Sequence, residues 1–386
     1  MRILLFTGKG GVGKTTLAAA TAVRLAGRGH ATLVVSTDPA HSLADAFGTR
    51  LGGEPSLVDT RLHAAHVDTR GLVDSAWQEL RSKIQLILSG AGVDALDAEE
   101  LTVVPGLDEL LALTEVARLA RTGSWDVVVV DCGPTAETLR LLALPDAIAT
   151  YLQRAFPPRS VRGMVAGRQG WADAVARLAE HLSDLRELLA NPEVTGVRLV
   201  LTPERLVVAE SKRTLSALAL RDIRVDGLIA NRLVPKAGMR RGPAATWLRT
   251  RRGEQDAVLD ELRASTSLDV HVVEHRAAEP VGLDALRELA DALYGRTDPL
   301  VASGSRQSLL QIRPDGAAYL LRVAVPLTAS SDVDLARVGD DLAVTVDGMR
   351  RLVPLPAVLR RYSVVDASVD GDGLLIRFEI AVEALS

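Results

Sequence analysis

The chain has 386 residues, 47% of them hydrophobic, and a formal net charge of -4 at pH 7. This composition is typical of a globular protein long enough for two hydrophobic cores, and it lacks the basic excess of proteins that bind nucleic acid. No uninterrupted apolar run reaches the roughly 18 to 20 residues that a membrane-spanning helix needs, so we expect no stable membrane insertion. The single cysteine, Cys132, excludes an intrachain disulfide and a multi-cysteine metal site, and we expect a cytoplasmic protein.

Six short apolar runs predict the strands of one sheet: "RILLFT", "ATLVVS", "DVVVVD", "VRLVLT", "DGLIAN" and "DVHVVE". They are almost continuously apolar, as expected of parallel strands that are buried on both faces. The first run leads directly into a glycine-rich loop, which favours a strand over a signal peptide. Helical patterns separate the runs, as at residues 15–29, where Gly27 and Gly29 can end the helix. This alternation predicts an α/β fold with a doubly wound, mainly parallel sheet.

The remaining segments suggest a second, smaller domain. Two longer helical stretches, at about 72–122 and 143–191, are predicted insertions into the α/β domain, which we place at residues 1–295. The polar segment 296–307 contains Gly, Pro and Ser and is typical of a linker. Residues 308–386 carry short alternating runs such as "YLLRVAVPL" and "LLIRFEIAV", separated by turn groups such as "VDGDG". These runs predict a small all-β sandwich.

The stretch "GKGGVGKT" at residues 8–15 fits the phosphate-loop pattern G-x-x-x-x-G-K-[ST], and it follows a predicted strand and opens a helix. Glycines let successive N–H groups point at phosphate oxygens, and the helix N-terminus adds a partial positive charge. We expect Lys14 to reach the β- and γ-phosphates of ATP and the Thr15 hydroxyl to bind Mg²⁺. The predicted nucleotide-binding residues here are Gly8, Lys9, Gly10, Gly11, Val12, Gly13, Lys14, Thr15 and Thr16. No second loop of this kind is present, so one nucleotide site is expected.

Two aspartates follow predicted strands. Asp131 ends "DVVVVD", the position of a Walker B carboxylate that holds the magnesium shell. Asp38, in "STDPAHS", follows another strand on the edge where ligands bind to open α/β sheets. It could orient or deprotonate the attacking water and contribute to the magnesium shell through water. An isolated aspartate at a strand end is more often a helix cap, but these segments occur in order with the phosphate loop, which favours catalysis.

Three segments, "KGGVGKTT", "DPAHSLADAF" and "DCGPTAETLRLL", resemble those of the ArsA/GET family of deviant-Walker ATPases, in a bacterial form with one nucleotide site. Further blocks such as "VPGLDELLAL" and "AAEPVGLDAL" extend the resemblance over residues 1 to about 295. The C-terminal portions "DDLAVTVDGMRRLVPLP" and "ASVDGDGLLIRFEI" resemble the small heat-shock protein (α-crystallin, HSP20-like) sandwich. The family includes the arsenite-pump ATPase and the targeting factor for tail-anchored membrane proteins.

The resemblance implies a homodimer in which Lys9 crosses the interface and contacts the phosphates bound by the other protomer. It also implies that residues 38–47 form a first switch, in which Asp38 places the water, and that "DCGPTAETLRLL" forms a second. It further places Asn231 at the position where the family contacts adenine. A side-chain amide suits this contact because it can both donate and accept hydrogen bonds. Arg205 and Glu210 flank a segment that resembles one at the facing protomer's nucleotide, although such residues are also ordinary on an exposed helix.

Several departures separate this sequence from family members with known clients. It has no C-x-x-C pair for zinc, and one cysteine cannot form a three-thiolate arsenite site. Cys132 directly follows the strand with Asp131, which favours a buried structural role. The second switch has Ala136 and Glu137 where the family usually has Gly-His before the threonine.

These observations favour a Mg²⁺-dependent ATPase that dimerises and binds or targets a hydrophobic or membrane protein client. The alternative is the driver subunit of an arsenite or anion efflux pump, working with a membrane permease. Apolar residues of the insertions, among them Trp77 and Ile84, could form a client groove or simply pack on the sheet. Exposed edge strands of the sandwich could pair with a client, or the domain could be a structural appendage. A positioning ATPase of the ParA/MinD type and a metabolic enzyme with the same loop fit the sequence less well.

Overall fold

The computed structural model describes residues 1–38, 42–67, 107–132, 184–185, 187–189, 191–219, 223–238, 241–266, 268–301, 310–316, 318–323, 332–346, 349–370 and 373–380. They form two compact units, one of Met1–Gly196 with Ala278–Leu300 and one of Val197–Ala277 with Val301–Ser386. None of the described helices is both long enough and apolar enough to cross a membrane.

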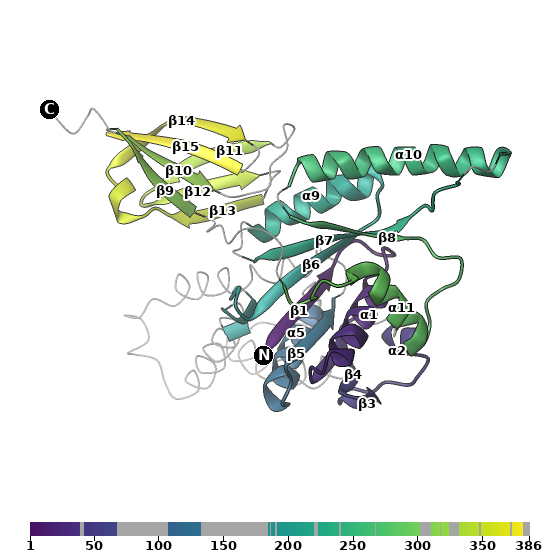
Figure 1. Cartoon of the computed structure of the whole chain (residues 1–386). Helices are drawn as coiled ribbons and strands as arrows, with labels where there is room; N and C mark the ends of the chain where they lie inside the picture. Colours follow the sequence, from purple (N-terminus) through teal and green to yellow (C-terminus); the bar gives the residue numbers. More distant parts are fainter. Residues whose placement is uncertain are drawn as a thin grey trace, which may run out of the picture. The chain divides into compact units, whose positions relative to one another are not determined.

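Eight strands form the large sheet in the order β3-β4-β2-β5-β1-β6-β7-β8 (Figure 1). They are β1 Arg2–Thr7, β2 Thr32–Ser36, β3 Ser56–Asp59, β4 Leu62–His66, β5 Val127–Asp131, β6 Thr195–Leu201, β7 Val225–Leu233 and β8 Val270–Glu274. The pairs β1–β5, β2–β5, β2–β4, β6–β7 and β7–β8 are parallel, and β3 runs antiparallel to β4. The predicted α/β fold with a mainly parallel sheet is therefore confirmed, with an antiparallel strand at one edge.

All six strands predicted from apolar runs are present, and the central ones are buried on both faces of the sheet. Every residue of β2, β5 and β6 is buried, so no polar face interrupts these runs. The apolar pattern of the sequence does not predict β3 and β4. The edge strand β3 reads "SLVD" and is only partly buried, and β4 reads "LHAAH", so neither has the continuous apolar pattern of a central strand.

The described helices of the first unit include α1 Lys14–Gly27, α2 Ser42–Phe47, α5 Leu107–Thr122 and α11 Leu283–Tyr294. Helix α1 begins in the phosphate loop and packs beside α11 (Figure 1). Between them the buried Thr21 hydroxyl lies 2.8 Å from the Tyr294 hydroxyl, and Arg24 pairs with Asp291 at 2.6 Å. Just after the end of α1, Arg28 Nη2 donates to the main-chain carbonyl of Thr297 at 3.1 Å. One face of α1 thus holds the chain that leaves the α/β domain after α11.

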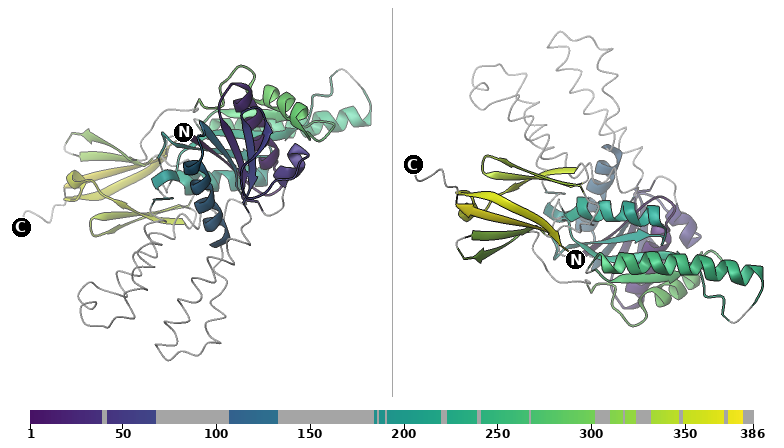
Figure 2. Two further views of the ribbon diagram at one scale, coloured as in Figure 1. Left: turned by 90° about the horizontal axis from the view of Figure 1, so that it is seen from below. Right: turned by 90° about the horizontal axis from the view of Figure 1, so that it is seen from above.

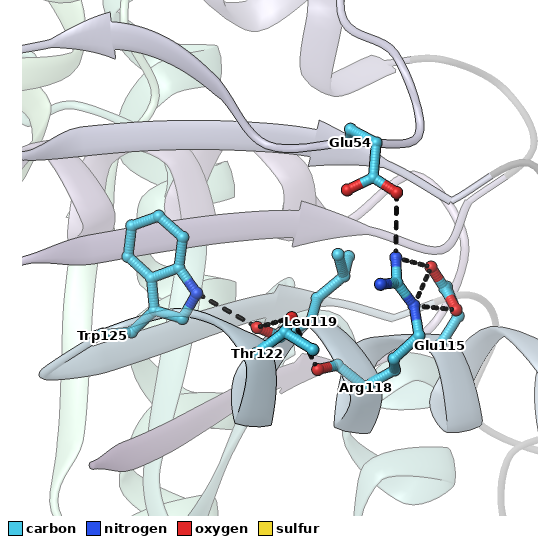
Figure 3. Close-up of polar contacts among 6 residues, drawn as sticks. All are labelled: Glu54, Glu115, Arg118, Leu119, Thr122 and Trp125. Carbon is cyan, nitrogen blue, oxygen red and sulfur yellow. Dashed lines mark hydrogen bonds and ion pairs between the residues drawn. The ribbon is translucent and has the colours of Figure 1, made fainter.

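Two sets of hydrogen bonds connect the C-terminal half of helix α5 with its surroundings (Figure 3). Arg118 donates to Glu115 on the same helix and to Glu54 at the edge of the sheet, with distances of 2.6 and 3.1 Å from Nη2. Trp125 Nε1 donates to the carbonyl of Leu119 at 3.1 Å and closes the turn into β5. The Arg118 pairs are exposed and contribute little stability. The bond between Trp125 and Leu119 spans the end of α5 and the start of β5, the strand that ends in Asp131.

The second unit contains α9 Arg205–Ala219 and α10 Pro243–Ala264 together with β7 and β8. Its core includes an ion pair between Arg198 of β6 and Asp226 of β7, whose Nε and Oδ1 atoms lie 3.8 Å apart. Both side chains are at least 98% buried, since their exposed fractions are 2% and 1%. Gly227 provides the space for this pair, because a Cβ there would lie 2.6 Å from Arg198 Nη1.

The C-terminal residues form two antiparallel sheets that face each other (Figure 2). One sheet has the order β14-β15-β10-β9 and the other β11-β12-β13. The elements are β9 Leu310–Asp315, β10 Ala318–Val323, β11 Val333–Val338, β12 Asp341–Val346, β13 Met349–Pro354, the 3₁₀ helix η2 Ala357–Leu359, β14 Tyr362–Asp370 and β15 Gly373–Ile380. Both sheets contribute to one apolar core, which includes Leu321, Val344 and Phe378. The predicted small all-β fold is confirmed.

Loss of Asp226 should destabilise the protein strongly, because it would leave the buried Arg198 guanidinium without its carboxylate. We expect Asp226→Ala to lower the free energy of unfolding by about 3 kcal/mol, as measured by urea denaturation. Asp260→Ala is the matched control, since it removes an exposed partner of Arg263 and should change the same quantity by less than about 0.5 kcal/mol. Equal effects of the two substitutions would contradict this prediction.

Candidate phosphate-binding site

The glycines of the loop between β1 and α1 have backbone angles that other residues seldom adopt. Gly11 and Gly13 have φ values of +78° and +94°. A Cβ on Gly11 would meet nothing within 4 Å, so conformation rather than space requires glycine at this position. Helix α1 starts without a side-chain cap and without an acidic residue in its first turn. Its first N–H groups and the positive end of its dipole are therefore suited to an anion.

The two lysines of the loop lie in opposite environments. Lys14 is buried, with only 6% of its surface exposed, and its Nζ donates to the main-chain carbonyl of Lys9 at 3.2 Å. Lys9 itself is exposed. The ammonium group of Lys14 is thus held within the loop of its own chain, whereas that of Lys9 belongs to the surface.

Parallel pairing brings the predicted carboxylates to the same edge of the sheet as the loop. Ser36 of β2 and Phe6 of β1 are both register partners of Asp131 of β5. The chain continues from β1 into the phosphate loop and from β2 to Asp38, so both segments leave the sheet beside Asp131. The structure therefore brings together the loop, Asp38 and Asp131, as the sequence predicts.

Asp131 is fully buried, and burial raises its pKa to about 6. The hydroxyls of Thr15 and Ser36 and the charge of Lys14 lower the pKa, while the nearby Asp38 raises it. Ser36 Oγ donates to Asp131 Oδ2 at 2.9 Å. Among the residues that the structure describes, Oδ1 has no hydrogen-bond partner. A buried carboxylate with one oxygen unused is suited to a cation or to a metal-bound water.

Hydroxyl groups complete this part of the site. Thr15 Oγ1 lies 3.1 Å from Ser42 Oγ at the start of α2, so the phosphate loop contacts the predicted first switch. The main-chain N–H of Asp38 donates to Ser36 Oγ at 3.2 Å. The sequence pattern alone does not indicate a role for Ser36 or Ser42. Both lie in the quoted "STDPAHS" segment, but serine is too common for its position alone to indicate a site.

The other three predicted residues, Asn231, Arg205 and Glu210, lie in the second unit, so their nearness to the loop stays a prediction. Asn231 is near the end of β7, and its Oδ1 accepts from the main-chain N–H of Arg232 at 2.9 Å. Arg205 is the first residue of α9 and lines a cavity of about 430 Å³. Glu210 is half-buried on the same helix.

Several predictions lie outside the described residues. These are the second switch from residue 133 onward, the segment 39–41 of the first switch, and the apolar stretch with Trp77 and Ile84. Cys132, which is described, is buried, and burial raises the pKa of its thiol to about 12. The expectation that this cysteine is buried is confirmed.

Comparison with known proteins agrees with this geometry. Residues 1–295 match the family model for anion-transporting ATPases, and residues 316–378 match the HSP20-like domain found in ArsA. The protein Rv2184c of Mycobacterium tuberculosis is 38% identical over 98% of this chain and 96% of its own length. A Chlorobaculum tepidum protein, provisionally named an arsenical pump-driving ATPase, is 34% identical over 98% of this chain and 96% of its own length. The ATPase GET3B of Arabidopsis thaliana is 32% identical over 74% of this chain and 77% of its own length.

The chain therefore belongs to the ArsA/GET family of ATPases and carries a C-terminal HSP20-like domain. Members of this family hydrolyse ATP, so the phosphate loop serves an ATPase.

The buried Asp131 makes a pH-dependent contribution to the stability of the nucleotide-free protein. Its pKa rises on folding from the ordinary 3.8 to about 6, so between these values the folded protein keeps a proton that the unfolded chain has lost. Stability therefore falls as pH rises through this window, by up to about 3 kcal/mol. Asn cannot ionise, so Asp131→Asn should be more stable than the parent at pH 7.5 and similar at pH 4, as measured by urea unfolding. A difference that does not change with pH would contradict this prediction.

Proposed function

We propose that this ATPase works as a nucleotide-gated homodimer whose Mg²⁺-dependent cycle of ATP hydrolysis controls the binding or targeting of a hydrophobic or membrane protein client. The observation that carries the dimer is the contrast between buried Lys14 and exposed Lys9. Lys14 is positioned for the nucleotide of its own loop. The exposed Lys9 suits the nucleotide of a facing protomer, where it would stabilise charge on the transferred phosphoryl group.

The positions of the remaining site residues suggest a role for each of them. Asp38, which follows β2, would place the attacking water, and the glycine loop with Thr16 would surround the phosphates. Asn231 would contact the adenine edge. Arg205 and Glu210 would lie near the nucleotide of the facing protomer, which agrees with the exposure of Arg205 at the start of α9.

Magnesium fits the chemistry of the residues beside the loop. Thr15 and Asp131 would hold it, with Asp38 contributing through water, since hydroxyl and carboxylate oxygens are ligands that Mg²⁺ prefers. The hydrogen-bonding capacity that Asp131 Oδ1 leaves unused among the described residues supports this assignment. When bound, the ion would neutralise charge on the β- and γ-phosphates.

Two observations favour a protein client over arsenite. The only cysteine is buried, and its pKa of about 12 keeps the thiol protonated at neutral pH, so it is unsuited to binding a thiophilic metalloid. The HSP20-like sandwich has edge strands, β14 and β9, that could pair with an extended chain. The alternative, a driver subunit of an arsenite or anion pump with a membrane permease, is favoured by the name of the Chlorobaculum relative.

We further place the ATPase domain at residues 1–295 with its two insertions, the linker at 296–307 and the sandwich at 308–386. Arg24 of α1 and Arg28, just after that helix, donate hydrogen bonds to main-chain carbonyls of residues 295–297. These bonds agree with a domain end at this point. We place the whole protein in the cytoplasm, acting without nucleic acid.

The action of Lys9 across a dimer can be tested by mixing two inactive variants. Lys9→Ala and Asp38→Asn should each lower kcat by roughly 10³-fold or more. In a mixed dimer, one site contains the intact Asp38 of its own chain and the intact Lys9 of its partner. The mixture should therefore recover about a quarter of the parental rate, the value expected for random pairing of two-fold symmetric subunits. If Lys9 acted on its own nucleotide, both sites of the mixed dimer would be defective and no activity would return.

The client can be sought with Asp38→Asn, which we expect to bind ATP and hydrolyse it poorly, so that the ATP-bound state accumulates. Tagged protein recovered from its host cells with ATP should be enriched in proteins with a terminal hydrophobic helix, as identified by mass spectrometry. Lys14→Ala, which should lose nucleotide binding, is the control and should lack this enrichment. Recovery of a single polytopic permease instead would contradict the client hypothesis and favour the pump.

A further inference from the structure

The Ser36 hydroxyl connects the Asp131 carboxylate with the main chain of Asp38. Ser36 is the last residue of β2 and is completely buried. Its Oγ donates to Asp131 Oδ2 at 2.9 Å and accepts from the main-chain N–H of Asp38 at 3.2 Å. The strand end, the magnesium-binding carboxylate and the segment that carries Asp38 therefore meet at a single oxygen atom.

The neighbouring hydroxyl of Thr37 shows that this arrangement is not required for the fold alone. Thr37 Oγ1 and the main-chain N–H of Thr37 both donate to the main-chain carbonyl of Asp131, at 3.3 and 3.0 Å. The backbones of β2 and β5 are already joined there without the Ser36 side chain. The Ser36 hydroxyl instead contacts the Asp131 carboxylate, and it uses Oδ2 while leaving Oδ1 without a partner among the described residues.

A serine hydroxyl can donate one hydrogen bond and accept others. Ser36 therefore acts as a donor to Asp131 and as an acceptor for the main-chain N–H of Asp38. Its single proton is given to the carboxylate, which restricts rotation of the buried Asp131 side chain. The accepted bond from Asp38 orients the first residue after the strand. A movement of the Asp38 backbone would therefore change the bonding of the same hydroxyl that holds Asp131.

We propose that Ser36 is a positioning residue for ATP hydrolysis: its hydroxyl presents Asp131 Oδ1 to magnesium and couples the Asp38 segment to that carboxylate. The inference rests on the proposed magnesium site. Ser36 itself would touch neither nucleotide nor ion, and its effect would pass through Asp131.

The test uses Ser36→Ala in the full chain, with ATP hydrolysis titrated with Mg²⁺ and binding of a fluorescent ATP analogue measured with and without Mg²⁺. We expect the Mg²⁺ concentration for half-maximal rate to rise roughly tenfold or more, as for loss of a residue that orients a metal ligand. Affinity for the analogue without Mg²⁺ should stay unchanged, and Ser36→Thr should restore the Mg²⁺ response. Ser216→Ala is the matched control, because this buried serine on α9 donates to the main-chain carbonyl of Lys212.

A second comparison separates positioning from general damage. In an Asp131→Asn background, Ser36→Ala should cause no further loss in the gain of affinity that Mg²⁺ provides, because its effect requires the carboxylate. The inference is overturned if Ser36→Ala leaves the Mg²⁺ titration unchanged, or if it lowers the Mg²⁺-dependent gain equally in both backgrounds. A parent protein that responds to Mg²⁺ in neither assay would overturn the magnesium site itself, and this inference with it.

Discussion

The parallel register of β1, β2 and β5 is the constraint on which the site depends. Phe6, Ser36 and Asp131 are aligned across the three strands, so the chain leaves each strand at the same edge of the sheet. The phosphate loop, the Asp38 segment and the Asp131 carboxylate are separated by up to about a third of the sequence, yet they meet because parallel strands end on one side. Burial of these strands on both faces makes the edge rigid, and a rigid edge can hold polar groups within hydrogen-bonding distance.

That rigid edge contains a carboxylate in an unfavourable place. Asp131 loses the solvation of water and regains only part of it from the Ser36 and Thr15 hydroxyls and from Lys14, which is why its pKa is raised. A structure optimised only for stability would place a neutral or apolar residue there. The magnesium ion of the proposed function would restore the missing interaction.

The family assignment establishes the reaction of this protein but does not identify its client. Membership in the ArsA/GET family establishes ATP hydrolysis, but relatives are named after both an arsenical pump and GET proteins. The single cysteine is buried in the α/β unit, and burial raises the pKa of its thiol to about 12. The C-terminal sandwich has its own apolar core formed by both of its sheets, so it can be a domain in its own right rather than an extension of the large sheet.

Much of the fold and of the site could be predicted from the sequence, because the relevant signals are local. A strand buried on both faces must be apolar throughout, and a loop that wraps phosphate must place glycines where φ is positive, as at Gly11 and Gly13. These requirements identified the central strands, the phosphate loop, Asp38 and Asp131. Only the tertiary structure shows the partly polar strands β3 and β4, the different burial of the two lysines, and the hydrogen bonds of Ser36. Each of these depends on neighbours distant in the sequence, and a serine or lysine carries no local mark of whether a strand 95 residues away will bury it.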